Sequence, residues 1–161
     1  MKKLSILLLL ITPFFAMSQK KAGSAAQYKA TYSSNFVMDD AKYSNVILTL
    51  WKDFEDNTLD KHRSFFSDTI TMLLADGKKV KGLENNLKGV KQSRNALKNY
   101  KTSVVAYMSI KSVDENKHFV TIWGDDNFTD KNGKKATVHT HEIWGFNKDG
   151  KVDYMAQYTA M

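Results

Sequence analysis

Hydrophobic positions follow a helical period in three stretches of the chain. From about Asp39 to Asp56, one helix face at i, i+3, i+4 and i+7 holds Ile47, Leu50, Trp51 and Phe54. Thr58 can then cap a second, short helix that carries Leu59, His62, Phe65 and Phe66. A third helical face extends from residue 83 to about 98 and holds Leu83, Leu87, Val90 and Leu97.

Alternating and β-branched positions predict strands in the remaining segments. A strand at 69–74 and a short return strand at 78–81 flank the turn Asp76-Gly77. Four longer strands are expected at about 101–112, 117–128, 135–146 and 151–159. The predicted order is two helices, a short hairpin, a third helix and a long antiparallel meander. This order is typical of an α+β fold in which a curved sheet wraps around the helices.

Two glycine turns set the pairing of the last three strands. Asn132-Gly133 and Asp149-Gly150 supply the positive φ that tight hairpins need. If Asn132-Gly133 is a two-residue turn, Trp123 lies opposite Glu142. If Phe146 lies opposite Lys151, Glu142 faces Met155 and Thr140 faces Gln157.

This register sorts the side chains onto two faces of the sheet. The first face is expected to carry Thr121, Trp123, Asp125, Thr140, Glu142, Trp144, Met155 and Gln157. The second is expected to carry Val120, Ile122, Asp126, Phe128, His139, His141, Ile143, Tyr154 and Tyr158. A tighter second turn would slide the pairing by two residues and keep these faces, whereas a bulge would invert part of them.

The first face contains the candidate chemistry. Glu142 and Asp125 are expected to form an acid/base pair, because burial and mutual repulsion can keep one proton bound near neutral pH. The alternative is that one or both carboxylates are solvated at the rim. The residues expected to contact a ligand are Trp123, Trp144, Thr140, Met155, Gln157 and Trp51, although such aromatic residues can equally form the core.

The second face offers a weaker metal-binding pattern. His139 and His141 lie on one side of a strand and could hold a divalent metal together with Asp126, but no third ligand is fixed by spacing. We therefore expect no metal and no cofactor. A dimer interface or a pH response is the alternative role for the two histidines.

Two segments carry a resemblance to a known family: FEDNTLDKHRSFFSDTITMLLADGKKVKG and WGDDNFTDKNGKKATVHTHEIWGFNKDGKVDYMAQY. They resemble the nuclear-transport-factor-2-like superfamily, in particular its SnoaL-like branch, and the resemblance covers about 42–160. It implies a cone-shaped α+β fold, a pocket on the first face and a homodimer through the open sheet face. It also implies that Glu142 matches a pocket acid of ketosteroid-isomerase relatives. Leu74 and Leu50 stand where those relatives have a general base and a tyrosine, which argues against steroid isomerisation.

The N-terminal residues are typical of an export signal. Lys2 and Lys3 precede an apolar run, and Ala16-Met17-Ser18 suits cleavage before Gln19. An uncleaved anchor is the alternative, but the run is shorter than the roughly 20 residues of a spanning helix. We expect a signal peptide at 1–18, a mobile leader at 19–38 and a domain at 39–161. The protein would then be periplasmic or secreted in a bacterium and free of the membrane.

Charge and composition narrow the possible functions. The net charge of +7 falls to +5 without Lys2 and Lys3, because 22 basic residues then face 17 acidic ones. The basic excess between Lys78 and Lys101 is interpreted as a solvated helix face, with no nucleic-acid partner. The chain has no cysteine, which excludes disulfides and thiol chemistry. It also lacks a nucleotide-binding loop, a serine elbow and a zinc-protease motif.

Three functions remain open at this point. The first is an exported domain that binds a small apolar or aromatic molecule. The second is an acid/base isomerase, dehydratase or hydrolase that uses the same pocket. The third is a module for dimerisation or other interactions.

Overall fold

The computed structural model describes residues 27–160, and a compact unit begins at Tyr32. The expected signal peptide, and the leader up to residue 26, lie outside the described residues. The elements in chain order are β1 (Phe36–Met38), α1 (Ala41–Asp56), a 3-10 turn (Arg63–Phe65), β2 (Phe66–Leu73), β3 (Lys79–Lys81), α2 (Leu83–Asn95), β4 (Lys98–Ser112), β5 (Lys117–Thr129), β6 (Lys135–Phe146) and β7 (Val152–Ala160).

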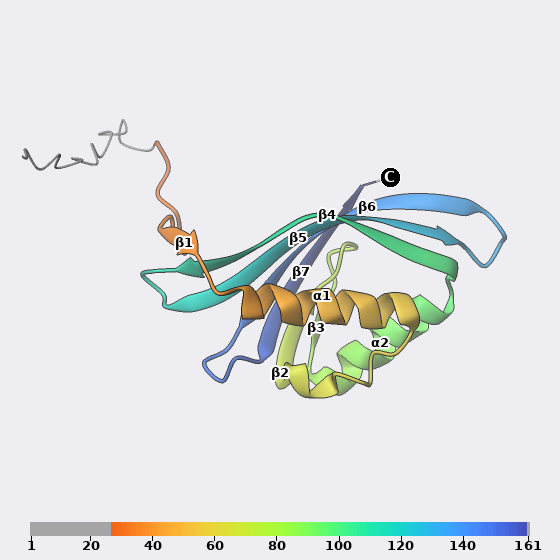
Figure 1. The fold of residues 1–161 in the computed structure, drawn as a ribbon, viewed down its shortest axis with the longest axis horizontal. Coiled ribbons are helices and arrows are strands. Elements are labelled where there is room, and N and C mark those ends of the chain that lie inside the picture. Colours follow the sequence, from red (N-terminus) through yellow and green to blue (C-terminus); the bar gives the residue numbers. More distant parts are fainter. Residues whose placement is uncertain (1–26, 161) are drawn as a thin grey trace, which may run out of the picture. The chain divides into compact units, whose positions relative to one another are not determined.

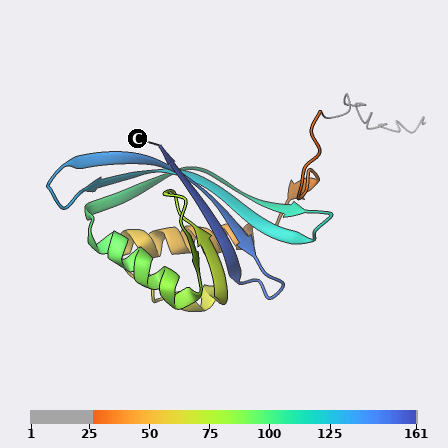
Figure 2. The same ribbon diagram turned by 180° about the vertical axis from the view of Figure 1, so that it is seen from behind.

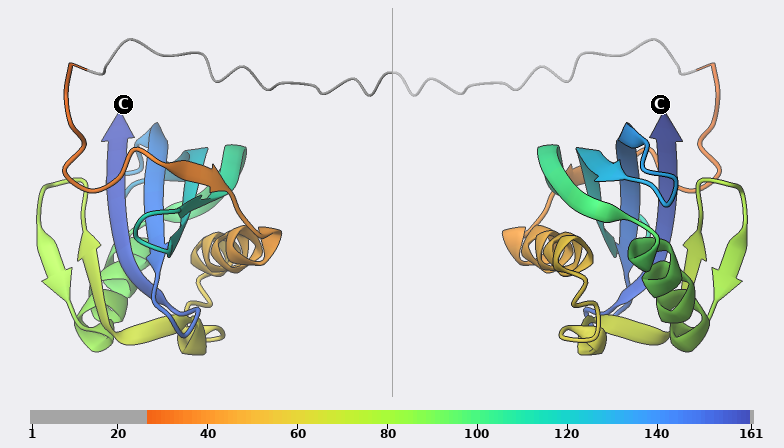
Figure 3. Two further views of the ribbon diagram at one scale, coloured as in Figure 1. Left: turned by 90° about the vertical axis from the view of Figure 1, so that its left-hand side faces the viewer. Right: turned by 90° about the vertical axis from the view of Figure 1, so that its right-hand side faces the viewer.

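The strands form one seven-stranded sheet in the order β1-β4-β5-β6-β7-β2-β3. All neighbours are antiparallel except β2 and β7, which are parallel. The sheet curves over the two helices, and both helices lie on its concave side (Figures 1 and 2). The end-on views show α1 beneath β4 and β5, and α2 beside β2 (Figure 3). The predicted α+β architecture is confirmed.

Helix α1 begins and ends where its sequence predicts. Asp40 caps it by accepting a hydrogen bond from the Lys42 backbone N–H at 2.8 Å. Asn57 ends it in the left-handed conformation, at φ 57°. The apolar stripe faces the sheet and buries Ile47, Leu50 and Trp51. This stripe supplies one wall of the core, and β5, β6 and β7 supply the other.

Two predictions for the N-terminal half of the chain are wrong, one for the second helix and one for the start of the folded domain. The second helix is only a 3-10 turn, since Phe66 begins β2 opposite Val152 and is buried in the core. Burial in a strand therefore outweighs the helical spacing of this short segment. The folded part also begins before Asp39, because β1 pairs with Ile110, Lys111 and Ser112 of β4.

The turn between β5 and β6 differs from the expected one. Its loop has three residues, Lys131 to Gly133, and is closed by hydrogen bonds between Asp130 and Lys134. The Asp130 carboxylate accepts the backbone N–H groups of Asn132 and Lys134, and Gly133 takes φ 83°. A three-residue loop with a left-handed glycine is a common hairpin connection. It shifts the register by one residue relative to the two-residue turn.

That single shift transfers β5 to the opposite face. Glu142 lies opposite Ile122, and Trp123 lies opposite His141, so the predicted Trp123–Glu142 pairing is wrong. The second hairpin has the same type of loop plus a bulge at Phe146, and Glu142 pairs with Gln157 instead of Met155. This slip of two residues preserves the faces of β6 and β7 as expected.

Candidate functional site

The concave face encloses a cavity of about 90 Å³ between α1, α2 and the centre of the sheet. Its walls are mostly apolar. The lining residues are Leu50, Trp51, Phe54, Leu59, Phe66, Met72, Leu87, Val90, Tyr100, Thr102, Asp126, Thr140, Glu142, Trp144 and Met155. Ligand pockets usually have volumes of roughly 300–1,000 Å³. The enclosed space therefore suits a compact molecule.

Glu142 lies in the wall of this cavity and is buried. Its Oε2 accepts the indole N–H of Trp51 at 2.6 Å and that of Trp144 at 2.9 Å. Its Oε1 accepts the side-chain amide of Gln157 at 2.9 Å. Three neutral donors from α1, β6 and β7 thus hold the carboxylate in one orientation.

The surroundings of Glu142 favour its protonated form. Burial and, to a smaller extent, the nearby Asp126 carboxylate together raise the pKa of Glu142 to about 7, against the opposing effect of the three donors. Both indoles converge on Oε2, so the oxygen that can take up a proton is Oε1. The Gln157 amide can then rotate and offer its carbonyl oxygen to that proton.

A second carboxylate, Asp126, enters the cavity from β5. Its Oδ1 accepts the Tyr100 hydroxyl at 2.5 Å and the Thr102 hydroxyl at 2.7 Å, and its Oδ2 accepts the Thr140 hydroxyl at 2.7 Å. Burial, together with the Asp126 charge, raises the pKa of Tyr100, so its phenol remains a donor. Glu142 and Asp126 are the acidic side chains of the cavity wall.

The structure brings together most of the residues predicted for the pocket. Trp51, Thr140, Trp144 and Met155 line the cavity beside Glu142. Gln157 touches the site through its hydrogen bond to Glu142. Whether these residues bind a ligand stays a prediction.

Asp125 and Trp123 lie on the convex face, away from the cavity, as a result of the register shift. Asp125 Oδ1 lies 2.8 Å from His139 Nδ1, and so the expected pairing of Glu142 with Asp125 is absent. The Trp123 ring stacks on His141 at a centroid distance of 4.6 Å, and His141 lies 5.9 Å from the Tyr158 ring. These three rings form an aromatic row across β5, β6 and β7.

The histidines and Asp126 are on opposite sides of the sheet. His141 Nε2 lies 2.8 Å from the Thr121 hydroxyl, whereas Asp126 faces the cavity. Among residues 27–160, no group of three potential ligands is arranged to hold a metal ion. Within the same residues, no helix is long and apolar enough to cross a membrane.

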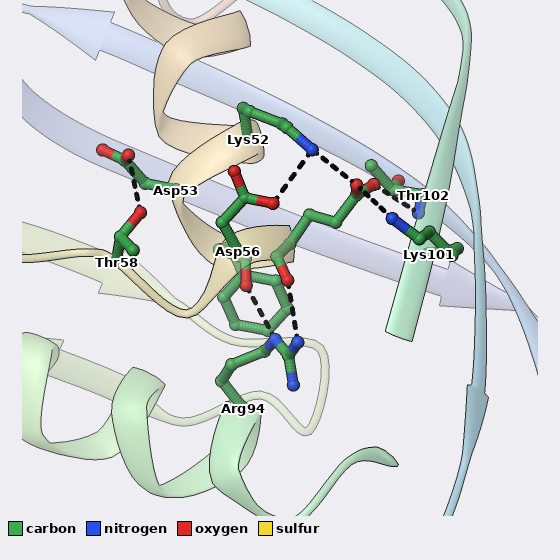
Figure 4. Close-up of polar contacts among 9 residues, drawn as sticks. Lys52, Asp53, Asp56, Thr58, Arg94, Lys101 and Thr102 are labelled. Carbon is green, nitrogen blue, oxygen red and sulfur yellow. Dashed lines mark hydrogen bonds and ion pairs between the residues drawn. The ribbon is translucent and has the colours of Figure 1, made fainter. Parts of the chain in front are cut away.

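Arg94 connects the helices and β4 at the side of the cavity. Its guanidinium donates to the carbonyls of Phe54 and Glu55 at the end of α1, both at 2.7 Å (Figure 4). It also lies over the Tyr100 ring. Phe54 and Tyr100 in turn pack edge to face at 5.1 Å. Arg94 therefore holds the backbone at Phe54 and contacts the Tyr100 ring, and both of these side chains line the cavity.

Glu55 joins the same end of α1 to β4. Its carboxylate accepts hydrogen bonds from Lys52, the backbone N–H of Thr102 and Lys101 (Figure 4). The Lys52 contact, followed by the Thr102 N–H, lowers the pKa of Glu55 to about 2. A carboxylate that stays ionised is thus suited to hold the helix end to the strand that carries Tyr100 and Thr102.

Gly124 lets α1 approach the sheet closely. A Cβ at this position would lie 2.5 Å from Cζ3 of Trp51 and 2.9 Å from the Ser103 carbonyl oxygen. The Trp51 ring therefore occupies the space that any other residue would fill. This contact places the Trp51 indole N–H against Glu142.

Sequence reasoning missed Asp126, Tyr100 and Thr102 as cavity residues. Asp126 was assigned to the wrong face by the one-residue register error. The informative signal is the repeated pattern Asx-Lys-Asx-Gly-Lys at Asp130–Lys134 and Asn147–Lys151. In each case the first side chain accepts two backbone N–H groups of its own loop, which indicates a three-residue connection.

Comparison with known proteins identifies the fold. No protein-family model matches the chain, and no curated protein matches it. Solved structures do match. The epoxide hydrolase/cyclase-like enzyme SalBIII of salinomycin pyran-ring formation has a TM-score of 0.62 and 13% identity, covering 78% of this chain and 95% of that one. This chain has the nuclear-transport-factor-2-like fold.

Two further matches share that fold. A SnoaL-like protein from Jannaschia sp. CCS1 has a TM-score of 0.61 and 14% identity, covering 83% of this chain and 91% of that one. A protein with a ketosteroid isomerase-like fold from Catenulispora acidiphila DSM 44928, in complex with trimethylamine, has a TM-score of 0.56 and 14% identity. That match covers 74% of this chain and 86% of the other. The fold implied by the sequence resemblance is confirmed.

Proposed function

We propose that this protein is an exported domain that binds a small, largely apolar or aromatic molecule in the concave cavity. The observation that carries the proposal is Glu142, an ionisable group buried in an apolar wall and held by Trp51, Trp144 and Gln157. Burying a carboxyl group destabilises a fold unless hydrogen bonds compensate for the lost hydration. Here three side chains are committed to orienting it, which supports a role in recognition.

The cavity limits the chemistry of the ligand. A volume of about 90 Å³ with aromatic and aliphatic walls suits a compact ring or branched hydrocarbon. Glu142 and the hydroxyl-bonded Asp126 can bind one polar group, such as a hydroxyl, of that molecule. The match to a solved complex with trimethylamine is consistent with a small ligand in this fold.

The experiment is a titration with phenol, a compact aromatic molecule with one hydroxyl group, followed by ¹H–¹⁵N spectra of the indole groups. Phenol in the cavity is expected to shift the N–H resonances of Trp51 and Trp144. Trp123, on the convex face, is an internal control and should not move. The proposal fails if the two cavity indoles stay unchanged, or if Trp123 alone responds.

A second candidate function is acid/base catalysis in the same cavity. It is favoured by the raised pKa of Glu142, which suits a general acid, beside Asp126 as a base. In that case Glu142→Gln abolishes turnover and leaves folding intact. Turnover that persists in this variant would show that Glu142 is neither acid nor base.

A third candidate is dimerisation through the convex face. It is favoured by the aromatic row of Trp123, His141 and Tyr158, of which Tyr158 is 52% exposed. A second copy of the chain would cover these rings. Sedimentation velocity is expected to give a dimer that dissociates in Tyr158→Asp, and a wild-type monomer would exclude this role.

A further inference from the structure

A second hollow adjoins the cavity, between the β2–β3 hairpin and α2. This outer groove has a volume of about 570 Å³ and is more open than the cavity. Phe54 and Val90 line both hollows. Gln157 lines the groove, and its amide donates to Glu142 in the cavity wall. These three side chains therefore lie at the boundary between the two spaces.

Two of the three side chains at this boundary can change rotamer without movement of the backbone. Phe54, Val90 and Gln157 are all half-buried. Val90 is β-branched and stiff within a helix, whereas Phe54 and Gln157 have alternative rotamers. Rotation of Gln157 would join the groove to the cavity and expose Oε1 of Glu142 to whatever occupies the groove.

The polar lining of the groove is neutral. Its charged residues, Asp76 and Lys78, pair with each other. The side-chain amide nitrogen of Asn86 donates to the carbonyls of Ile70, Val80 and Gly82. The amide and hydroxyl groups of the groove lining belong to Asn85, Asn86, Gln92, Ser93 and Gln157.

Gly89 keeps this groove open. It lies in the interior of α2, where glycine destabilises a helix relative to alanine. Its φ is not positive, and a Cβ would have no atom within 4 Å, so neither the backbone nor a close approach requires glycine. Any larger side chain would project into the groove. Glycine at position 89 thus lowers the stability of α2 and leaves open space in the groove.

We propose that the cavity and the groove are two parts of one site for an elongated amphipathic molecule. Its compact apolar end occupies the cavity and presents one polar group to Glu142. Its other end carries uncharged hydroxyl or amide groups and lies along α2, with Gln157 between the two parts. This inference rests on the proposed function, since it assigns the class of ligand that the cavity would bind.

The test compares phenol with 4-hydroxyphenyl β-D-glucoside, which keeps a phenol hydroxyl and adds a neutral hydroxylated group at the opposite end of the ring. Affinities are measured from the indole resonances of Trp51 and Trp144. The glucoside is expected to bind the wild type roughly tenfold more tightly than phenol, because one or two neutral hydrogen bonds are added. Gly89→Leu should bind phenol as the wild type does and lose the preference for the glucoside.

Lys88→Leu is the matched control, since Lys88 is exposed next to Gly89 and does not line the groove. It should keep the tenfold preference. If Gly89→Leu does not fold, Ser93→Leu fills the groove from an exposed position instead.

The outcomes separate the two proposals. Phenol binding without any preference for the glucoside would overturn the two-part site and leave the cavity as a binding pocket. The same conclusion follows if the preference survives in the groove-filling variants. Absence of phenol binding would remove the proposed function, and the two-part site with it.

Discussion

At the scale of single residues, Glu142 shows how placement determines chemistry. The sequence predicts a pocket acid at this position, and the structure places it in the cavity wall. Its expected partner was Asp125, yet the neighbouring Asp126 is the carboxylate that shares the cavity. Alternation along a strand makes adjacent residues face opposite ways, so the identity of a partner depends on register. Composition and spacing alone do not fix it.

The raised pKa of Glu142 predicts how stability depends on pH. The unfolded chain loses this proton near pH 4.5 and the folded chain near pH 7. Between these values the folded state binds more protons, so the free energy of unfolding falls as pH rises, by about 3 kcal/mol in total. The stabilising effect is complete below pH 4.5 and is lost above pH 7.

Urea unfolding of the wild type and Glu142→Gln across this pH range measures the effect. The variant is expected to gain about 3 kcal/mol over the wild type as pH rises, because its amide does not ionise. The amide oxygen can accept both indole N–H groups, and the amide nitrogen can donate to the carbonyl oxygen of a rotated Gln157. Asp125→Asn, on the convex face, is the control and should keep the pH dependence due to Glu142. Parallel curves for the wild type and Glu142→Gln would contradict the account.

At the scale of elements, most helix and strand positions followed from the sequence, apart from the second helix and β1, but strand pairing did not. The periodicity of α1 and the alternation of the last four strands arise because each element is buried on one side. The identity of each residue, apolar or polar, therefore predicts the element. Strand register depends on loop length. The sequence around Gly133 is compatible both with a two-residue Asn-Gly turn and with a three-residue loop closed by an Asx side chain. The hydrogen bonds of Asp130 within its own loop decide between them.

The contact between α1 and β5 yields a second prediction. Gly124→Ala would push Trp51 away from the strand and weaken its hydrogen bond to Glu142. Overpacking of this kind destabilises a fold by about 1–3 kcal/mol. Chemical unfolding is expected to show this loss, together with a change in Trp51 fluorescence.

Gly145→Ala provides the comparison for Gly124→Ala. Gly145 also lies inside a strand, but a Cβ there would come no closer than 3.3 Å to any atom. Its substitution should cost clearly less than that of Gly124. Equal losses in the two variants would show that the close approach of Trp51 is not what Gly124 provides.

At the scale of the whole molecule, the fold could be predicted and the contents of the cavity could not. The order of elements and the two quoted segments indicate a curved sheet around helices, and the structure confirms it. The cavity forms from fifteen side chains on seven helices and strands and one loop, and no local sequence pattern predicts how these are placed relative to one another. Export and removal of residues 1–18 remain predictions, because these residues lie outside the described part.

The most direct test is native mass spectrometry of the protein purified from its own source. We expect a chain that begins at Gln19 and retains a small molecule. Met155→Phe, which reduces the cavity, should lose that molecule, whereas Met108→Phe on the exposed sheet surface should keep it. A ligand-free wild type, or the same added mass in both variants, would contradict a binding site at Glu142.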